Sequence, residues 1–100
     1  MNLQEFTESV ESDAAPEGMD GALSALWWDA KGDWNQAHEH AQDAGNREGD
    51  WVHAYLHRKE GDEGNAGYWY SRASQPFFEG SLADEWRHIA GTLLGEGFAT

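Results

Sequence analysis

The sequence predicts an all-α protein of five or six helices, arranged as two antiparallel hairpins with a further helix on either side. Apolar residues recur three and four positions apart along most of the chain, which is the spacing of one helix face. Glycines and helix-capping residues divide this pattern into short segments. A Gly-Asp pair also recurs after 29 residues, which indicates an internal repeat of a helical hairpin.

The length and composition of the chain favour one domain. A chain of 100 residues has room for a single hydrophobic core. Its hydrophobic fraction of 39% is low, but six Trp, three Tyr and four Phe enlarge the surface that can be buried. Each buried aromatic side chain removes about 150–250 Å² from water. We therefore expect residues 20–95 to fold rather than to be disordered.

The strong acid excess argues against several classes of partner. The formal charge is −13, from nineteen acidic residues against six Lys and Arg. A surface of this sign repels phosphate backbones and anionic membranes, so we predict no nucleic-acid partner and no membrane partner. High solubility and mimicry of DNA by acidic groups remain as alternative roles for the charge. The sequence has no cysteine, signal-peptide pattern or long apolar run, and we therefore expect a cytoplasmic location.

The N-terminal segment 1–18 is an acidic arm. Within it, Leu3, Phe6 and Val10 are spaced for one face of a helix over residues 2–12. The first twenty residues hold six acids and no base, so the sequence leaves two alternatives for the arm, a short helix or a frayed segment. The predicted helical domain comprises the remaining residues, 19–100.

The first predicted hairpin begins with a helix over 19–31. This helix ends at Gly32, because glycine readily takes the left-handed conformation of a helix C-cap. Asp33 caps the return helix, which runs to Ala44. We expect the next residues, 45–49, to form a turn.

The second predicted hairpin repeats this plan. A helix over 50–60 ends at Gly61, and Asp62 caps a return helix that runs to Ala73. A proline follows soon after and stops the helical pattern. Ser81 then provides the N-cap of a last amphipathic helix.

The repeated residues resemble the tetratricopeptide or Sel1-like helical repeat. The run Gly32-Asp33-Trp34-Asn35-Gln36-Ala37 is similar to the turn between the two helices of a tetratricopeptide unit. The run Trp69-Tyr70-Ser71-Arg72-Ala73 resembles the end of a Sel1 return helix. The period is shorter than is usual for the family, and His53 stands where the second unit usually has Leu. The resemblance covers residues 20–76 and implies stacked helical hairpins.

The same resemblance implies a peptide-binding groove formed by the first helix of each hairpin. Mapped onto this chain, the groove is expected to expose Leu26, Asp29, Trp51, Tyr55, Arg58 and Lys59. Aromatic rings beside two cations suit a carboxylate or an acidic peptide end. The first predicted function is therefore a non-enzymatic module that binds a protein, a peptide or a second copy of itself. The alternative for Arg58 and Lys59 is a favourable interaction with the C-terminal end of their helix dipole.

The helices outside the two hairpins have an expected role as well. Two hairpins cannot cover both faces of a repeat array, since about three repeats are needed for that. We expect the helices over 2–12 and 81–94 to act as caps. Homodimerisation is the other way to cover an exposed face.

A pair of histidines provides an alternative function. His53 and His57 are four positions apart, so both rings project from one face of a helix. This spacing suits two ligands of a zinc ion, with Glu60 and Asp29 as candidates for further ligands. Metalloproteases need a Glu directly after the first His, and Ala54 stands there, so proteolysis is not expected. Acid–base chemistry and packing of both imidazoles among aromatic rings remain as further interpretations.

Two more histidines lie in the return helix of the first hairpin. His38 and His40 point about 200° apart around a helix, so they are not expected to share an ion. His38 leans toward the alanine face of that helix and is expected to be half-buried, whereas His40 is expected to be solvated.

One further resemblance carries no functional information. The run Trp51-Val52-His53-Ala54-Tyr55-Leu56-His57-Arg58 is similar to segments of short bacterial proteins of unknown function. It implies no activity. The sequence also shows neither a phosphate-binding glycine loop nor a serine nucleophile motif, so no catalytic residue is predicted and an enzyme is the less favoured interpretation.

Overall fold

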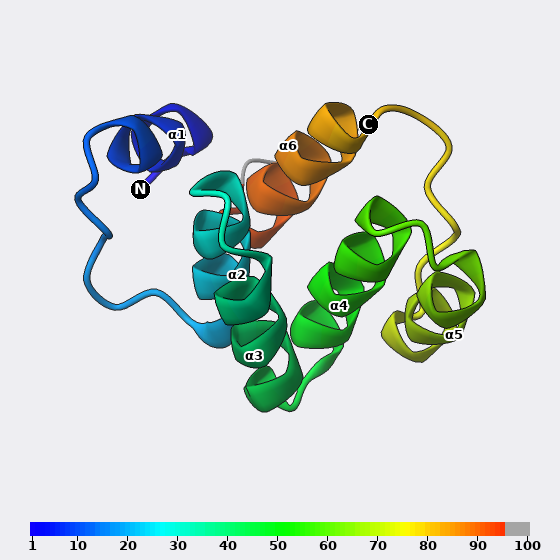
Figure 1. Cartoon of the computed structure of the whole chain (residues 1–100). Helices are drawn as coiled ribbons and strands as arrows, with labels where there is room; N and C mark the ends of the chain where they lie inside the picture. Colours follow the sequence, from blue (N-terminus) through cyan, green and yellow to red (C-terminus); the bar gives the residue numbers. More distant parts are fainter. Residues whose placement is uncertain (96–100) are drawn as a thin grey trace.

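The computed structural model describes residues 1–95 and contains six α-helices and no strand in that range (Figure 1). The helices are α1 (Leu3–Glu11), α2 (Gly21–Ala30), α3 (Trp34–Ala44), α4 (Arg47–Lys59), α5 (Glu63–Ala73) and α6 (Leu82–Leu93). The all-α fold class is therefore confirmed. The last five residues of the predicted helical domain, 96–100, lie outside the described part of the chain.

The two Gly-Asp turns have nearly the same backbone geometry. Gly32 and Gly61 take left-handed conformations, with φ of +86° and +88°. Asp33 then accepts a hydrogen bond from the backbone N–H of Gln36, and Asp62 accepts one from the N–H of Asn65. In each hairpin the glycine ends the first helix and the aspartate caps the second, as the sequence predicts.

Helix α4 is the centre of the molecule. It packs against α3 and α5 along the row of hairpins, and against α2 and α6 as well. Residues 51–56 are therefore all buried, although an amphipathic helix at a protein surface would expose half of them. Fully buried Ala37 and Ala66 lie on the neighbouring helices α3 and α5. Such small side chains allow helix backbones to approach closely.

Helix α4 begins earlier than the sequence suggests. The predicted turn over 45–49 is only two residues long, because Asn46 caps a helix that starts at Arg47. Gly49, taken from the sequence as part of the turn, lies inside α4. A Cβ atom on Gly49 would approach the Cβ of Ala44 to 2.5 Å, so the glycine permits close contact between α4 and the end of α3.

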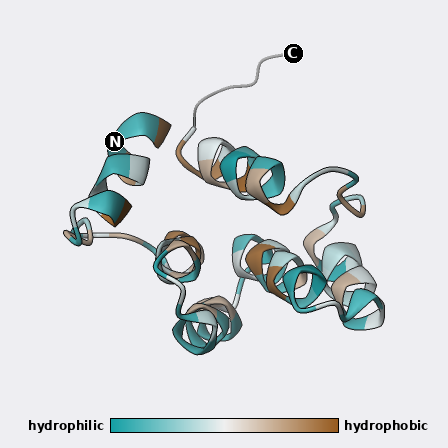
Figure 2. Ribbon diagram, turned by 45° about the horizontal axis from the view of Figure 1, so that its top comes forward, coloured by the Kyte–Doolittle hydropathy of each residue, from teal (hydrophilic) through white to brown (hydrophobic). Residues whose placement is uncertain are grey.

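The N-terminal segment forms the short helix α1, which is one of its two predicted alternatives. Asn2 closes a capping box with Glu5, and Phe6 is fully buried. On α2, the indole Nε1 of Trp27 donates a hydrogen bond to the Ser9 hydroxyl over 3.1 Å. Figure 2 shows α1 on the same side of the hairpin row as α6, with which it is in contact.

Helix α6 covers the open face of the two hairpins. It packs across the face formed by α2 and α4, and it makes a second layer over the hairpins (Figure 2). Ile89 and Ala90 are completely buried there, and the indole of Trp86 donates a hydrogen bond to the Leu26 carbonyl over 2.9 Å. The apolar face that two hairpins leave open is thus covered by the chain itself. Among residues 1–95, no helix has the length and apolar character needed to cross a membrane.

Candidate metal centre

Three histidines meet between the two hairpins. His38 comes from α3, and His53 and His57 come from α4. Each can offer a ring nitrogen such that all three atoms lie within 4.8 Å of one another. The ring centroids of His38 and His53 are 4.6 Å apart, and those of His53 and His57 are 4.8 Å apart. Both histidines predicted as a metal pair therefore belong to a larger cluster.

His38 is a ligand candidate that the sequence does not predict. Within one helix, the rings of His38 and His40 diverge. The interface between α3 and α4 brings in the third ring, because His38 follows the buried Ala37 and α3 packs directly against α4. A usable signal was present in the sequence, since His38 lies next to the alanine face that the repeat predicts to be buried.

Two tryptophans form walls around the cluster. The Trp34 ring stacks on His38 with a centroid distance of 4.9 Å and an interplanar angle of 13°. The Trp69 ring stacks on His53 at 3.9 Å and 16°. Trp34 is itself fixed, because its indole Nε1 donates to the Leu56 carbonyl over 3.1 Å. These stacks hold two of the three imidazoles in place and limit their contact with water.

The buried His53 has an unmet hydrogen-bonding group. Only 4% of this residue is exposed, and within residues 1–95 its Nδ1 is the one buried side-chain nitrogen or oxygen without a hydrogen-bond partner. Burial, followed by the nearby His38 and His57, lowers the pKa of His53 to about 4. Burial and His57 also lower the pKa of His38. Both rings are therefore neutral at pH 7, which is the form of histidine that binds metal ions.

A carboxylate supports the third histidine from outside. His57 Nδ1 lies 2.7 Å from Glu60 Oε2, just beyond the end of α4. A metal-binding histidine usually donates its other ring N–H to a carboxylate, which fixes the tautomer and the ring orientation. Glu60 was predicted as a direct ligand, and in the structure it forms this supporting contact. His57, Glu60 and Asp62 also have ligand atoms within 4.8 Å of one another.

Asp29, the other predicted ligand, does not join the cluster. Its Oδ2 accepts a hydrogen bond from the Tyr55 hydroxyl at 2.7 Å, and its Oδ1 accepts one from Lys59 Nζ at 2.8 Å. Asp29 lies on α2, and Tyr55 and Lys59 project from the face of α4 that meets α2 and α6 rather than α3. Burial and the nearby Asp29 raise the pKa of Tyr55, so the hydroxyl stays protonated and keeps donating.

The six residues of the predicted peptide groove do not form one open surface. Three of its six residues, Asp29, Tyr55 and Lys59, do lie together and line one cavity. Leu26 is completely buried and Trp51 is 6% exposed. Asp29 and Tyr55 are only 4% and 2% exposed, so the expectation of exposure is wrong for four of the six residues. The reason is the packing of α4 against α2 and α6.

The remaining groove residue, Arg58, belongs to a second buried cluster. Its Nη1 donates to Glu85 Oε1 over 2.9 Å, and its Nη2 donates to the Gly80 carbonyl. Glu85 is fully buried on α6 and also accepts a hydrogen bond from the hydroxyl of Tyr70 on α5. Burial raises the pKa of Glu85, against the opposing effects of Tyr70 and Arg58. The sequence offered one signal for this cluster, since Glu85 lies on the apolar stripe between Leu82 and Ile89.

The ligands of the histidine cluster suit a metal ion of borderline softness. Three imidazole nitrogens without sulfur suit zinc, copper, nickel or cobalt. A tetrahedral zinc ion with bonds of about 2.0–2.1 Å holds its ligand atoms ~3.3 Å apart. This separation is within reach of three rings whose ligand atoms already lie within 4.8 Å of one another. The fourth position of such an ion would remain for water or another small ligand.

Comparisons with known proteins identify no relative for this chain. No family model, curated protein or solved structure matches it. The resemblance to the tetratricopeptide or Sel1-like repeat therefore stays a prediction from the residues that carry it.

Proposed function

We propose that this protein binds a divalent transition-metal ion, zinc in the first instance, through His38, His53 and His57. The observation that carries the proposal is the unpaired and buried Nδ1 of His53, whose ring lies next to two further imidazoles. Buried polar atoms in native proteins almost always have a partner, so an exception calls for an explanation such as a bound ion. The low pKa of His53 and the carboxylate behind His57 support the same conclusion.

The proposed ion links the two hairpins. One ligand belongs to the second helix of the first hairpin, and two belong to the first helix of the second hairpin. A ligand that binds only the folded state stabilises it by about 2.7 kcal/mol at a concentration of one hundred times its Kd. The role that follows is metal-dependent stabilisation of the interface between α3 and α4. The predicted protein-binding function stays a prediction, since the face proposed for it is largely covered by α6.

Metal titration of the purified, chelator-treated protein tests this proposal. We expect one equivalent of zinc to bind and to raise the thermal midpoint, and cobalt to give the visible absorption of a tetrahedral nitrogen site. His38→Ala should weaken zinc binding at least tenfold, because it removes one of three ligands. The matched control is His40→Ala, on the same helix and outside the cluster, and it should bind zinc as the native protein does.

Two results would contradict the proposal. The first is binding of far less than one equivalent of zinc, with no change in the thermal midpoint. The second is equal zinc affinity in the native protein and in His38→Ala, which would assign any bound metal to residues other than the three-histidine cluster. Either result would favour the alternative in which the imidazoles are packed among aromatic rings.

A further inference from the structure

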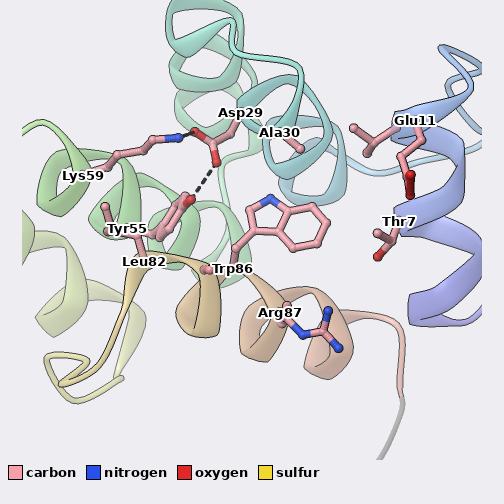
Figure 3. Close-up of a pocket in the computed structure, with 11 residues that line it drawn as sticks. Thr7, Glu11, Asp29, Ala30, Tyr55, Lys59, Leu82, Trp86 and Arg87 are labelled. Atoms are coloured by element: carbon pink, nitrogen blue, oxygen red, sulfur yellow. Dashed lines mark hydrogen bonds and ion pairs between the residues drawn. The ribbon is translucent and has the colours of Figure 1, made fainter.

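A second site lies on the other side of α4. A cavity of about 520 Å³ opens between α1, α2, α4 and α6, and none of the clustered histidines lines it (Figure 3). Its volume is in the range of pockets that hold small organic molecules. Apolar side chains from α1, α2 and α6 provide much of its wall: Val10, Ala30, Leu82 and Trp86.

Trp86 provides a flat surface in this cavity. Figure 3 shows its indole between the residues of α4 and those of α1. The indole Nε1 already donates to the Leu26 carbonyl, and the Phe6 ring stacks on the indole with a centroid distance of 5.6 Å. The ring is therefore held in place and is partly buried. What it offers to a ligand is an aromatic surface, which favours a planar apolar group.

Most polar groups around the cavity already have partners. Both carboxylate oxygens of Asp29 accept hydrogen bonds, from Tyr55 and from Lys59. The ion pair of Asp29 with Lys59 also balances one charge of each sign. The Thr7 hydroxyl donates to the Leu3 carbonyl over 2.8 Å. These groups shape the wall of the cavity, and they leave little unused hydrogen-bonding capacity at that end.

Two opposite charges at the cavity are exposed to solvent and have no partner among residues 1–95. Arg87 on α6 and Glu11 on α1 both line it. Neither forms a hydrogen bond or an ion pair with any residue in 1–95, and they do not pair with each other. The cavity thus presents one unused cation and one unused anion on different walls, beside an aromatic surface.

We propose that this cavity binds a free amino acid with an aromatic side chain. The carboxylate of such a ligand pairs with Arg87, its ammonium pairs with Glu11, and its ring lies against Trp86. Both side chains are exposed, so a zwitterion can form an ion pair with each of them, whereas a simple anion or a simple cation forms only one. The proposal does not depend on metal binding by the histidines.

The test is a titration of the ¹⁵N-labelled protein with L-phenylalanine, followed by nuclear magnetic resonance. The protein is kept in chelator, because amino acids also bind metal ions. The Trp86 indole resonance is assigned with Trp86→Phe. We expect saturable shifts of Trp86 and of the backbone of Ala83 and Ala30. Arg87→Gln and Glu11→Gln should each weaken binding about tenfold, the effect of one charge-assisted hydrogen bond.

Two analogues separate the roles of the charges. Arg87→Gln should weaken binding of 3-phenylpropionate, which keeps the carboxylate, and should leave phenethylamine unaffected. Glu11→Gln should have the reverse pattern. Arg47→Gln and Glu17→Gln make the same charge changes away from the cavity and should bind L-phenylalanine as the native protein does.

The proposal would be overturned by an absence of saturable shifts in the cavity residues. Equal binding of L-phenylalanine by the native protein, Arg87→Gln and Glu11→Gln would overturn it too. So would equal losses in the two control variants, which would indicate a general effect of net charge.

Discussion

Two buried polar clusters flank α4, and they differ in how completely they are satisfied. On one side Glu85 is fully buried, and its two carboxylate oxygens are paired with Arg58 and Tyr70. On the other side His53 is almost fully buried, and its Nδ1 has no hydrogen-bond partner within residues 1–95. A satisfied network has the properties of a structural connection. An unsatisfied cluster of ligand atoms has the properties of a site that awaits a ligand.

The two clusters also join different helices. The Glu85 cluster joins α4, α5 and α6, and it holds the second layer onto the hairpins. The histidine cluster joins α3 to α4, which already pack against each other through small side chains. Loss of the first cluster should therefore affect folding. Loss of the second should affect ligand binding more than folding.

The largest expected effect is that of Glu85→Ala. This change leaves the Arg58 guanidinium and the Tyr70 hydroxyl without their buried partner, and breaking a buried ion pair on one side costs about 3–5 kcal/mol. Because 16% of the Arg58 side chain is exposed, we expect a loss near the lower end, about 3 kcal/mol, in urea unfolding. The exposed Glu79→Ala is the control and should change the free energy of unfolding by less than about 0.5 kcal/mol. Equal effects of the two changes would show that Glu85 does not hold α6 in place.

The elements of the fold were largely predictable because their signals are local. Asp33 and Asp62 each cap the helix that follows them, by accepting a hydrogen bond from the backbone N–H three residues further on. The glycine before each of them has the left-handed backbone conformation. The place of α6 was not predictable in this way. It depends on which apolar face remains open after the hairpins pack, and no residue within α6 specifies that face.

The candidate site was predictable only in part for the same reason. The spacing of His53 and His57 is a property of one helix, and both belong to the cluster. His38 joins them from another helix, across an interface that exists only in the folded chain. Asp29 was expected near the histidines because it ends the neighbouring helix. The structure pairs it with Tyr55 and Lys59 on a different face of α4.

The two clusters should also respond to pH with opposite signs. The folded state lowers the pKa of His53 to about 4, whereas the unfolded chain has an ordinary histidine pKa of about 6.5. The unfolded state therefore binds more protons between these values, and the metal-free protein loses stability as the pH falls through this window. His53 should contribute a loss of about 2 kcal/mol between pH 7 and pH 4.5, measured by urea unfolding in chelator as the difference between the native protein and His53→Gln. The raised pKa of Glu85 acts in the other direction and weakens folding as the pH rises above about 4.5.

Replacement of each group isolates its own contribution to this pH dependence. His53→Gln cannot take up a proton, so its unfolding free energy should fall less between pH 7 and pH 4.5 than that of the native protein. Glu85→Gln should leave the histidine effect in place. If the pH dependence of His53→Gln equals that of the native protein, the buried imidazole is not the group that responds.

Two glycines compare the packing around the clusters, and one of them has the smallest expected effect. A Cβ on Gly49 would lie 2.5 Å from the Cβ of Ala44, whereas one on Gly67 in α5 would meet nothing within 4 Å. Gly67→Ala should therefore stabilise the protein by about 0.5–1 kcal/mol, because alanine is the better helix former. Gly49→Ala should destabilise it by about 1–3 kcal/mol through overpacking. It should also weaken zinc binding, since it forces α4 away from the helix that carries His38. Unchanged zinc affinity in Gly49→Ala, together with lower stability, would show that the histidine cluster tolerates movement of α3 relative to α4.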